Sequence, residues 1–167
     1  MLFLKPDLYV DSILDIPIDL LVESKIKGLI VDLDNTITEW NSPELKKEIF
    51  EWFAHLKIKQ INACIASNNS HSRVSHIGQY LGIPAISKAG KPRRRSFLQA
   101  MKLLNTLPES TAVIGDQLFT DILGGKRLGL YTILVKPLNP REFIGTKLMR
   151  QLEKIVLKKC IFKEDKL

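Results

Sequence analysis

The sequence has few of the residues on which disulfide-rich domains and zinc sites are built. It contains only two cysteines, Cys64 and Cys160, and their positions show no spacing typical of metal ligands. Both lie among apolar neighbours, which favours buried, reduced thiols over a disulfide framework. We therefore expect a protein of a reducing compartment, the cytoplasm.

Long hydrophobic runs are also missing. No stretch approaches the roughly 18 apolar residues of a membrane span. The first residues, M-L-F-L-K-P-D, reach Pro6 before any apolar region long enough for a signal peptide. There is no internal repeat and no low-complexity tract. These absences predict a soluble protein, or one bound peripherally to the inner face of a membrane.

What is present suits one globular domain. Hydrophobic residues make up 45% and charged residues 26% of the 167 residues, which fits a single full-sized core. We expect a lead-in over residues 1–27, a motif-bearing core over 28–135 and a basic helix over 136–167. The net charge of +7 favours anionic partners such as phosphate esters, acidic lipids or nucleic acid.

Short apolar runs alternate with amphipathic stretches of helical length. This alternation is typical of an α/β fold in which helices connect the strands of a parallel sheet. Apolar residues around Pro17 indicate short helical pieces in the lead-in, and Asn41-Ser42-Pro43-Glu44 predicts the start of a longer helix. The five expected strands are 29–31, 61–66, 85–87, 111–114 and 131–135.

The first strand ends abruptly in polar residues. Asp32 and Asp34 follow Val31, and Asn35 and Thr36 come next. Carboxylates two residues apart on an extended chain point to the same side and could face one ligand. Two like charges so close repel each other unless a cation neutralises them, and Mg²⁺ prefers oxygen ligands. An ordinary turn would use the same residue types.

Further polar residues stand where other strands are expected to end. Ser67 follows the second strand, Lys91 lies in Gly-Lys-Pro after the third, and Asp116 and Asp121 follow the fourth. In parallel α/β sheets, ligands bind at the carboxyl ends of the strands. Together with Asp-x-Asp-x-Thr at residues 32–36, these residues resemble the four motifs of the haloacid dehalogenase (HAD) superfamily. The resemblance covers residues 28–135.

Longer stretches narrow this resemblance. They are similar to the YqeG-like (IIIA-type) phosphatases, which are related to the phosphatidylglycerophosphate phosphatases. The resemblance implies a Rossmann-like HAD fold with about five parallel strands flanked by helices. It also implies a phosphatase and not a dehalogenase, because aspartate stands at both motif-one positions. The similar stretches are P-D-L-Y-V-D-S-I, D-L-D-N-T and I-G-D-Q-L-F-T-D-I-L-G-G-K-R-L-G-L-Y-T-I-L-V.

The resemblance also implies roles by matching position. Asp32 would be the nucleophile that takes up the phosphoryl group, and Asp34 the general acid and base. Mg²⁺ would be held by Asp32, Asp116 and the backbone carbonyl of Asp34. Asp121 would be another metal ligand, a residue that orients Lys91, or only a solvated helix charge. The implied phosphate-binding residues are Thr36, Ser67, Asn68 and Lys91.

The stretches between the motifs leave no room for a sizeable cap domain. Residues 33–66 and 68–90 are used by the strands and helices of the sheet itself. A site without a cap is open to solvent. We therefore expect a large phosphorylated substrate, or one carried by a membrane, a protein or a nucleic acid.

Two basic features bear on the substrate. Arg93, Arg94 and Arg95 lie beside Lys91. They form either a solvated helix start or a binding surface, since cations oppose the dipole at a helix N-terminus. Residues 142–162 carry apolar residues on one side and basic residues on the other. This pattern predicts a helix that packs on the core or lies on an anionic membrane.

The leading hypothesis is a Mg²⁺-dependent phosphomonoesterase that forms an aspartyl-phosphate and acts on phosphatidylglycerophosphate. The second keeps the chemistry and changes the substrate to a phosphoprotein, a nucleotide or a nucleic acid. The third is a non-catalytic HAD-like module that binds RNA or a ribosomal partner, although the intact set of catalytic residue types argues against it. A receiver domain fits worse, because Ser87 stands where its phosphoacceptor is expected.

Overall fold

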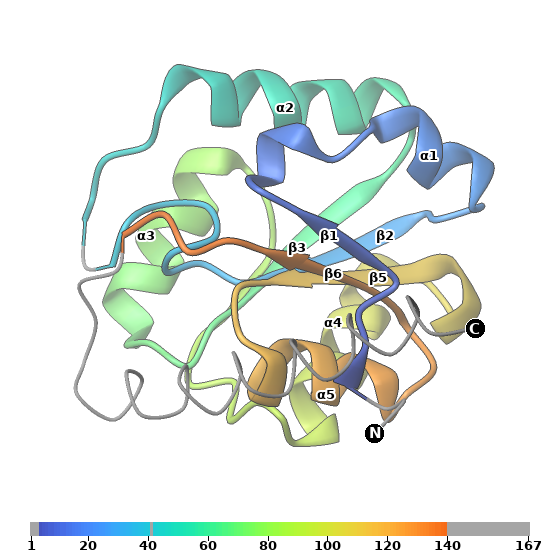
Figure 1. Cartoon of the computed structure of the whole chain (residues 1–167). Coiled ribbons are helices and arrows are strands. Elements are labelled where there is room, and N and C mark those ends of the chain that lie inside the picture. The colour runs from blue at the N-terminus through green and yellow to red at the C-terminus, as the bar shows by residue number, and fades with distance from the viewer. Residues whose placement is uncertain (1–3, 41, 140–167) are drawn as a thin grey trace, which may run out of the picture.

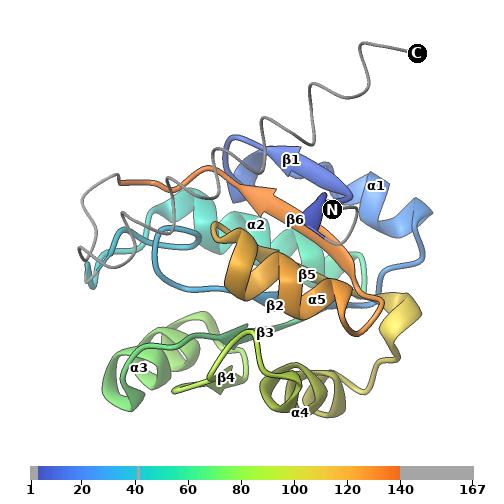
Figure 2. The ribbon, with the colours of Figure 1, turned by 60° about the horizontal axis from the view of Figure 1, so that its bottom comes forward.

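One parallel sheet runs through the computed structural model, which describes residues 4–40 and 42–139 (Figure 1). The strand order is β1-β6-β5-β2-β3-β4, and all neighbouring strands are parallel (Figure 2). The six strands are β1 (Leu8–Val10), β2 (Gly28–Val31), β3 (Asn62–Ala66), β4 (Ala85–Ile86), β5 (Thr111–Gly115) and β6 (Tyr131–Val135).

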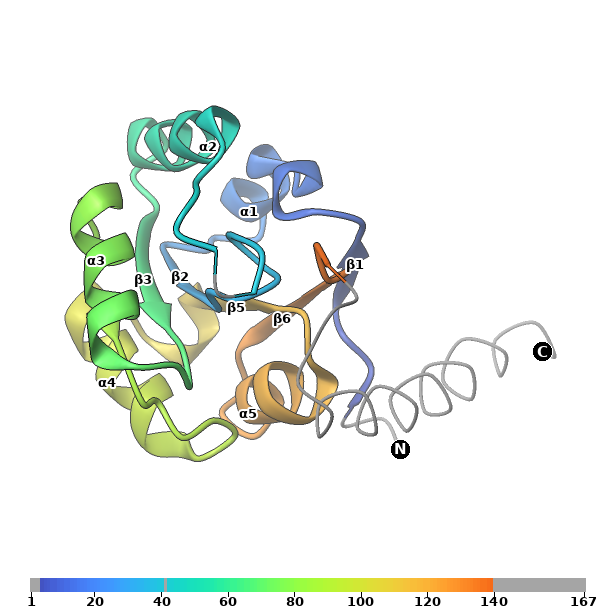
Figure 3. The same cartoon turned by 90° about the vertical axis from the view of Figure 1, so that its left-hand side faces the viewer.

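Helices cover both faces of the sheet. Helices α1 and α2 lie on one side, and α4 and α5 lie on the other (Figures 1 and 3). The α-helices are α1 (Ile18–Glu23), α2 (Lys47–Ile58), α3 (His71–Leu81), α4 (Arg94–Leu104) and α5 (Leu123–Lys126). Shorter turns are the 3₁₀ helices η2 (Ile13–Asp15) and η3 (Pro108–Ser110) and the π-helix η4 (Leu118–Ile122).

The central strand β2 is packed on both faces, as its apolar run predicts. Leu29 and Val31 join a core cluster with side chains of α1, α2 and α3. Ile30, which points the other way, joins a second cluster with side chains of α4. Each of the three side chains is at most 1% exposed, and burying such a side chain contributes about 1.5–3 kcal/mol. The strand that leads into Asp32 is therefore held firmly.

The carboxyl ends of β3, β2 and β5 lie side by side. β2 pairs with β3 on one side and with β5 on the other, so the strand order changes direction here, and ligands bind at such points. The ladders continue past the strands: Asp32 N donates to Ile114 O, and Ser67 N donates to Ile86 O, both at 2.9 Å. The residues that follow these strands are thus brought to one edge.

Within the described ranges the sheet has six strands, one more than the about five that the sequence predicts. The additional strand, β1, lies in the lead-in, for which the sequence predicts only helical pieces; those pieces are present as η2 and α1. β1 pairs with β6 in the register Leu8↔Ile133. An edge strand of three residues is too short for its periodicity to be recognised, and its partner lies far along the chain.

The start of α2 is a second correction. The helix begins at Lys47 and not at the Ser42-Pro43-Glu44 signal. The Thr38 hydroxyl donates to Glu44 O at 2.7 Å and to Ser42 O at 3.4 Å. These hydrogen bonds hold the segment as a loop against the turn after β2, because the acceptors are backbone carbonyls that face that turn.

No large cap is inserted within the described ranges, as the sequence predicts. α2 fills the connection from β2 to β3, and α3, β4 and α4 fill the connection from β3 to β5. Within residues 4–40 and 42–139, no helix combines the length and the apolar character that crossing a bilayer requires. The basic helix predicted over 136–167 lies, from residue 140 onward, outside the described residues and stays a prediction.

Candidate active site

A buried lysine joins two aspartates at the point where the strand order changes direction. Lys91 Nζ lies 2.6 Å from Asp32 Oδ1 and 2.7 Å from Asp121 Oδ1. The side chains of Lys91, Asp32 and Asp121 are 3%, 10% and 1% exposed. They come from the loop after β4, the end of β2 and η4. The contact with Asp121 is the one expected of a residue that orients Lys91.

Burial sets the protonation of this triad. Loss of hydration raises the pKa of Asp32 to about 7; the Lys91 ammonium opposes the rise, and the Asp121 carboxylate adds to it. Burial alone would lower the pKa of Lys91, but the two carboxylates raise it. One ammonium therefore serves two carboxylates, and Asp32 bears the remaining cost of burial. Additional positive charge at this site would stabilise the ionised form of Asp32.

Asp121 reaches Lys91 because a π-helical turn brings it against the end of β5. A Cβ on Gly115 would lie 2.3 Å from Asp121 Cγ, so only glycine leaves room for this carboxylate. Its Oδ2 accepts from Gln117 N at 3.3 Å and from the Thr120 hydroxyl at 3.2 Å. Both oxygens of Asp121 are thus engaged by protein donors. π-helical turns are frequent at functional sites.

Three buried carboxylates form a potential cation site. One oxygen from each of Asp32, Asp116 and Asp121 lies within 4.8 Å of the others, and Asp116 is only 3% exposed. Three carboxylates against one ammonium leave an excess of buried negative charge, which costs several kcal/mol unless it is neutralised. A hard divalent ion with oxygen ligands, such as Mg²⁺, fits this donor set. Asp32 and Asp116 are the better placed ligands, since both oxygens of Asp121 accept hydrogen bonds from protein donors, whereas Lys91 binds only Oδ1 of Asp32.

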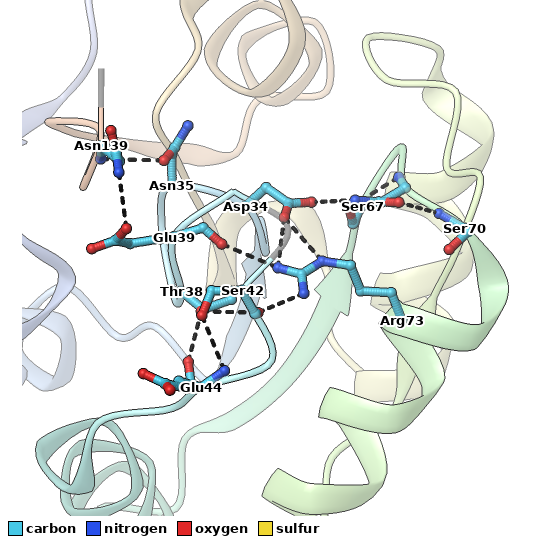
Figure 4. A network of polar contacts seen from close by, with 11 residues as sticks. Asp34, Asn35, Thr38, Glu39, Ser42, Glu44, Ser67, Ser70, Arg73 and Asn139 are labelled. Atoms are coloured by element: carbon cyan, nitrogen blue, oxygen red, sulfur yellow. Dashed lines mark hydrogen bonds and ion pairs between the residues drawn. The ribbon is translucent and has the colours of Figure 1, made fainter. Parts of the chain in front are cut away.

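Asp34 is held by an arginine that the sequence analysis does not single out. Arg73 Nε and Nη2 donate to Asp34 Oδ1 at 3.1 and 2.7 Å. Asn69 Nδ2 donates to Asp34 Oδ2 at 2.8 Å. Figure 4 shows Arg73 reaching from α3 to this carboxylate. Among the residues described, the Asp34 side chain is not part of the three-carboxylate cluster, so a part in metal binding is left to its backbone carbonyl.

The predicted phosphate-binding residues occupy different positions. Asn68 Oδ1 accepts from Lys91 N at 2.9 Å, so Asn68 supports the loop that carries the lysine. Ser67 is 2% exposed, and its hydroxyl accepts from Asn69 N at 3.1 Å. Thr36 is 1% exposed, and its hydroxyl has no hydrogen-bond partner within the described ranges. Ser67 directly follows β3, and Lys91 lies in the loop after β4. Asn68 instead holds the backbone of Lys91.

The three predicted surface arginines lie at the start of α4. Arg93 is the residue before the helix, Arg94 is its first residue, and both are exposed, as is Arg95. The helix is anchored behind them by Phe97, which is fully buried. Arg93–Arg95, called the arginine surface below, thus lies beside the buried Lys91.

Arg73 and Asn69 are the residues of this site that sequence reasoning missed. Asn69 directly follows Ser67-Asn68, so the rule that selects residues at strand ends could have included it. Arg73 stands in the first turn of α3, which begins shortly after β3 ends. The first turn of such a helix lies near the carboxyl edge of the sheet. That placement is the one signal the sequence carries for Arg73.

Comparisons with known proteins agree with this geometry. Residues 88–137 match the model of a family described as HAD-hydrolase-like. The chain is 42% identical over 155 residues to the probable phosphatase YqeG of Bacillus subtilis (strain 168), which covers 93% of this chain and 90% of that one. It is 27% identical over 145 residues to the mitochondrial phosphatidylglycerophosphatase GEP4 of Saccharomyces cerevisiae, covering 79% and 77% of the two chains.

A solved structure shows the same fold. The 3-deoxy-D-manno-octulosonate 8-phosphate phosphatase of Moraxella catarrhalis, in complex with magnesium, phosphate and KDO, superposes with a TM-score of 0.52. The identity is 17%, over 71% of this chain and 82% of that one. Fold and site together define a HAD-type phosphatase. With 42% identity over most of its length to the probable phosphatase YqeG, the chain belongs to the HAD superfamily and, within it, to the YqeG-like phosphatases.

Proposed function

We propose that the chain hydrolyses a phosphomonoester through a phosphorylated Asp32, with Mg²⁺ as cofactor. The observation that carries this proposal is the buried Lys91 ammonium shared by Asp32 and Asp121, with Asp116 close by. When bound by Asp32, Asp116 and the carbonyl of Asp34, Mg²⁺ supplies the positive charge that lets an anionic nucleophile approach an anionic phosphate.

In the first step, a carboxylate oxygen of Asp32 attacks the phosphorus, and the bond from phosphorus to the ester oxygen breaks. The departing oxygen takes the proton of the Asp34 carboxyl group, so the alcohol leaves neutral and Asp34 becomes a carboxylate. Lys91 Nζ, 2.6 Å from Asp32, offers its charge to the phosphoryl oxygens. The hydroxyl of Ser67, at the end of β3, is available to the same oxygens.

In the second step, water attacks the phosphorus of the aspartyl-phosphate. The proton of the water passes to the Asp34 carboxylate, the bond between phosphorus and Asp32 breaks, and inorganic phosphate leaves. Asp32 and Asp34 are then back in their starting states. Asp121 keeps Lys91 in place through both steps, since its own oxygens are held by Lys91, Gln117 and Thr120.

The favoured substrate is phosphatidylglycerophosphate, presented at an anionic membrane surface. Three observations support this choice: the absence of a large cap within the described ranges, the exposed arginine surface, and the 27% identity to a phosphatidylglycerophosphatase. Exposed arginines beside the reaction centre suit the phosphate groups of a lipid surface. The net charge of +7 acts in the same direction.

Phosphate release from phosphatidylglycerophosphate in mixed micelles tests the proposal, with and without Mg²⁺, for wild type and Asp32→Asn. We expect release that requires both Mg²⁺ and Asp32. Release from a small soluble ester alone would keep the chemistry and move the substrate to a phosphoprotein, a nucleotide or a nucleic acid. No phosphate release from any ester, together with salt-dependent RNA binding, would favour a non-catalytic module.

A second measurement tests the membrane-borne substrate. Replacing the arginine surface with alanines (R93A/R94A/R95A) should lower kcat/KM for the micellar lipid roughly 100-fold and leave a soluble ester almost unchanged, because each basic residue near an anionic surface contributes about 1 kcal/mol. The charge-matched control removes three exposed cations at the far ends of helices: K57A/K102A/R127A. Equal losses in the two triple variants would argue against a lipid-binding role.

A further inference from the structure

We propose that Arg73 is a positioning residue for Asp34, which fixes the carboxyl group that gives a proton to the leaving alcohol and takes one from water. The inference rests on the proposed function and assigns a residue that supports the acid and base at the same site. Arg73 itself touches neither phosphorus nor the leaving oxygen in this scheme. It acts through the orientation of Asp34.

The contacts of Asp34 leave its carboxylate little freedom. Arg73 binds one oxygen through two nitrogens, at 3.1 and 2.7 Å, and Asn69 binds the other at 2.8 Å. The side chains of Arg73 and Asp34 are only 13% and 16% exposed. A pair this sheltered is screened less by salt than a surface pair, and a guanidinium fork fixes direction as well as distance.

Arg73 also holds the backbone of the loop that carries Asp34. Its Nη1 donates to Ser42 O at 2.5 Å, and its Nη2 donates to Glu39 O at 3.2 Å. Asn35 N donates to Thr38 O at 2.7 Å and closes the turn between these points. Figure 4 shows the guanidinium lying between the carboxylate and the loop. One side chain thus fixes both the side chain of Asp34 and the turn that follows it.

Through Arg73, the position of Asp34 depends on α3, the helix that follows the strand next to β2. Arg73 belongs to α3, which follows β3, while Asp34 follows β2 and Asp32. Proton transfer requires heavy-atom distances of about 2.6–3.2 Å, and a misplacement of about 1 Å can cost about 100-fold in rate. A lysine at this position would offer one ammonium on a flexible stem and could not reproduce four directed contacts.

The test compares two esters whose alcohols differ in their need for a proton. We would measure kcat/KM of Arg73→Met for an alkyl phosphate and for p-nitrophenyl phosphate, with Mg²⁺ present. This constant covers the steps up to the departure of the alcohol and not the later hydrolysis. We expect a fall of about 100-fold for the alkyl ester and of less than about threefold for p-nitrophenyl phosphate, because p-nitrophenolate leaves without a proton.

Two backgrounds make the result specific. In an Asp34→Asn protein, Arg73→Met should add less than about threefold, because the group that Arg73 positions is already gone. Arg127→Met, which removes an exposed arginine from the end of α5, should match wild type on both esters. Asn69→Ala removes the second donor to Asp34 and keeps the loop contacts of Arg73, and we expect a smaller loss that is again confined to the alkyl ester.

Several results would overturn the inference and leave the proposed function standing. Equal losses on both esters, or a full further loss in the Asp34→Asn protein, would mean that Arg73 only holds the loop. Faster turnover of the alkyl ester by Arg73→Met than by wild type would mean that Arg73 holds Asp34 away from the substrate. If Arg73→Met does not fold, Asn69→Ala decides by the same ratio of esters. A wild-type protein that cleaves neither ester would overturn the proposed function itself.

Discussion

The molecule contains two aspartate–lysine pairs of equal length in opposite surroundings. At the carboxyl edge of the sheet, Lys91 Nζ lies 2.6 Å from Asp32, with side chains 3% and 10% exposed. At the amino edge, Lys126 Nζ lies 2.6 Å from Asp7, with side chains 21% and 33% exposed. Asp7 also accepts from the backbone N and the hydroxyl of Thr132, at 2.7 and 2.8 Å.

The pKa values of the two aspartates move in opposite directions. For Asp7, partial burial would raise the pKa, but Lys126 and the two donors of Thr132 outweigh it, and the pKa falls below its usual 3.8. For Asp32, burial wins, and the pKa rises to about 7 although Lys91 is equally close. The difference arises because Lys91 is shared with Asp121, and because Asp32 is deeper in the protein.

A short ion pair is therefore no measure of stability by itself. Asp7 gains more from its donors than it loses in hydration. It therefore ties the start of β1 to α5 through Lys126 and to β6 through Thr132, and these contacts stabilise the fold. The surroundings of Asp32 disfavour its ionised form. A buried pair of this kind is weak evidence for stability. The same environment leaves Asp32 poised for an external charge and a phosphate, which is what a nucleophile needs.

The largest effect should follow from Asp32→Asn. Turnover should fall on the order of 10⁴-fold or more, since an amide cannot form the aspartyl-phosphate. The unfolding free energy should change by only about 1 kcal/mol, because Lys91 keeps Asp121 and a poorly hydrated charge is removed. Phosphate release and urea denaturation of the same sample check both parts. Retained turnover would contradict the role of Asp32 as nucleophile.

Lys91→Met should combine a loss of activity with a loss of stability. It leaves Asp32 and Asp121 buried without their ammonium, which should cost about 3 kcal/mol of unfolding free energy and at least about 100-fold in kcat. Lys126→Met is the matched control at the amino edge and should cost about 1 kcal/mol with kcat unchanged. Urea denaturation and phosphate release of both variants measure the two losses. Equal destabilisation would show that depth does not separate the two pairs.

The residues around Lys91 could be predicted from the sequence, whereas the contacts of Asp7 could not. Asp32, Ser67, Lys91 and Asp116 each follow a strand, so short local patterns and the strand-end rule place them together. The hydrogen bond between Thr132 and Asp7 joins residues 125 positions apart. No local pattern marks such a partner, and β1 escaped recognition for the same reason.

Side-chain partners inside the site were also beyond the sequence. The spacing of Asp32 and Asp34 indicates that both carboxylates could face one ligand, but it does not reveal that Arg73 and Asn69 bind Asp34. The motif names Asp121 without deciding its role. The wide turn of η4, packed against Gly115, directs this carboxylate toward Lys91. Patterns identify which residues gather at an edge; packing decides which of them touch.

Asp7→Asn should give a smaller, pH-dependent effect. At about pH 7 it should cost about 1 kcal/mol, a charged hydrogen-bond contribution reduced for partial exposure, with activity unchanged. Because the folded-state pKa of Asp7 lies below 3.8, wild type holds this stability above that pH and loses it as the pH falls through the folded-state pKa. Urea denaturation at about pH 7, about pH 5 and about pH 3 should show the two proteins converging only at the lowest pH. A constant difference would contradict ionisation as the cause.

The smallest effect should follow from Glu51→Gln on α2, which sets the exposed limit of the comparison. Glu51 and Lys47 form an ion pair at 3.0 Å, one helical turn apart, with side chains 60% and 87% exposed. Water and salt screen such a pair, and ordering two long side chains offsets what attraction remains. Its urea midpoint should match that of wild type at low and high salt alike. A loss of unfolding free energy as large as that of Asp7→Asn would show that exposure does not determine the strength of these ion pairs. The difference between the Asp7 and Asp32 pairs would then have to be explained by Thr132, which donates two hydrogen bonds to Asp7.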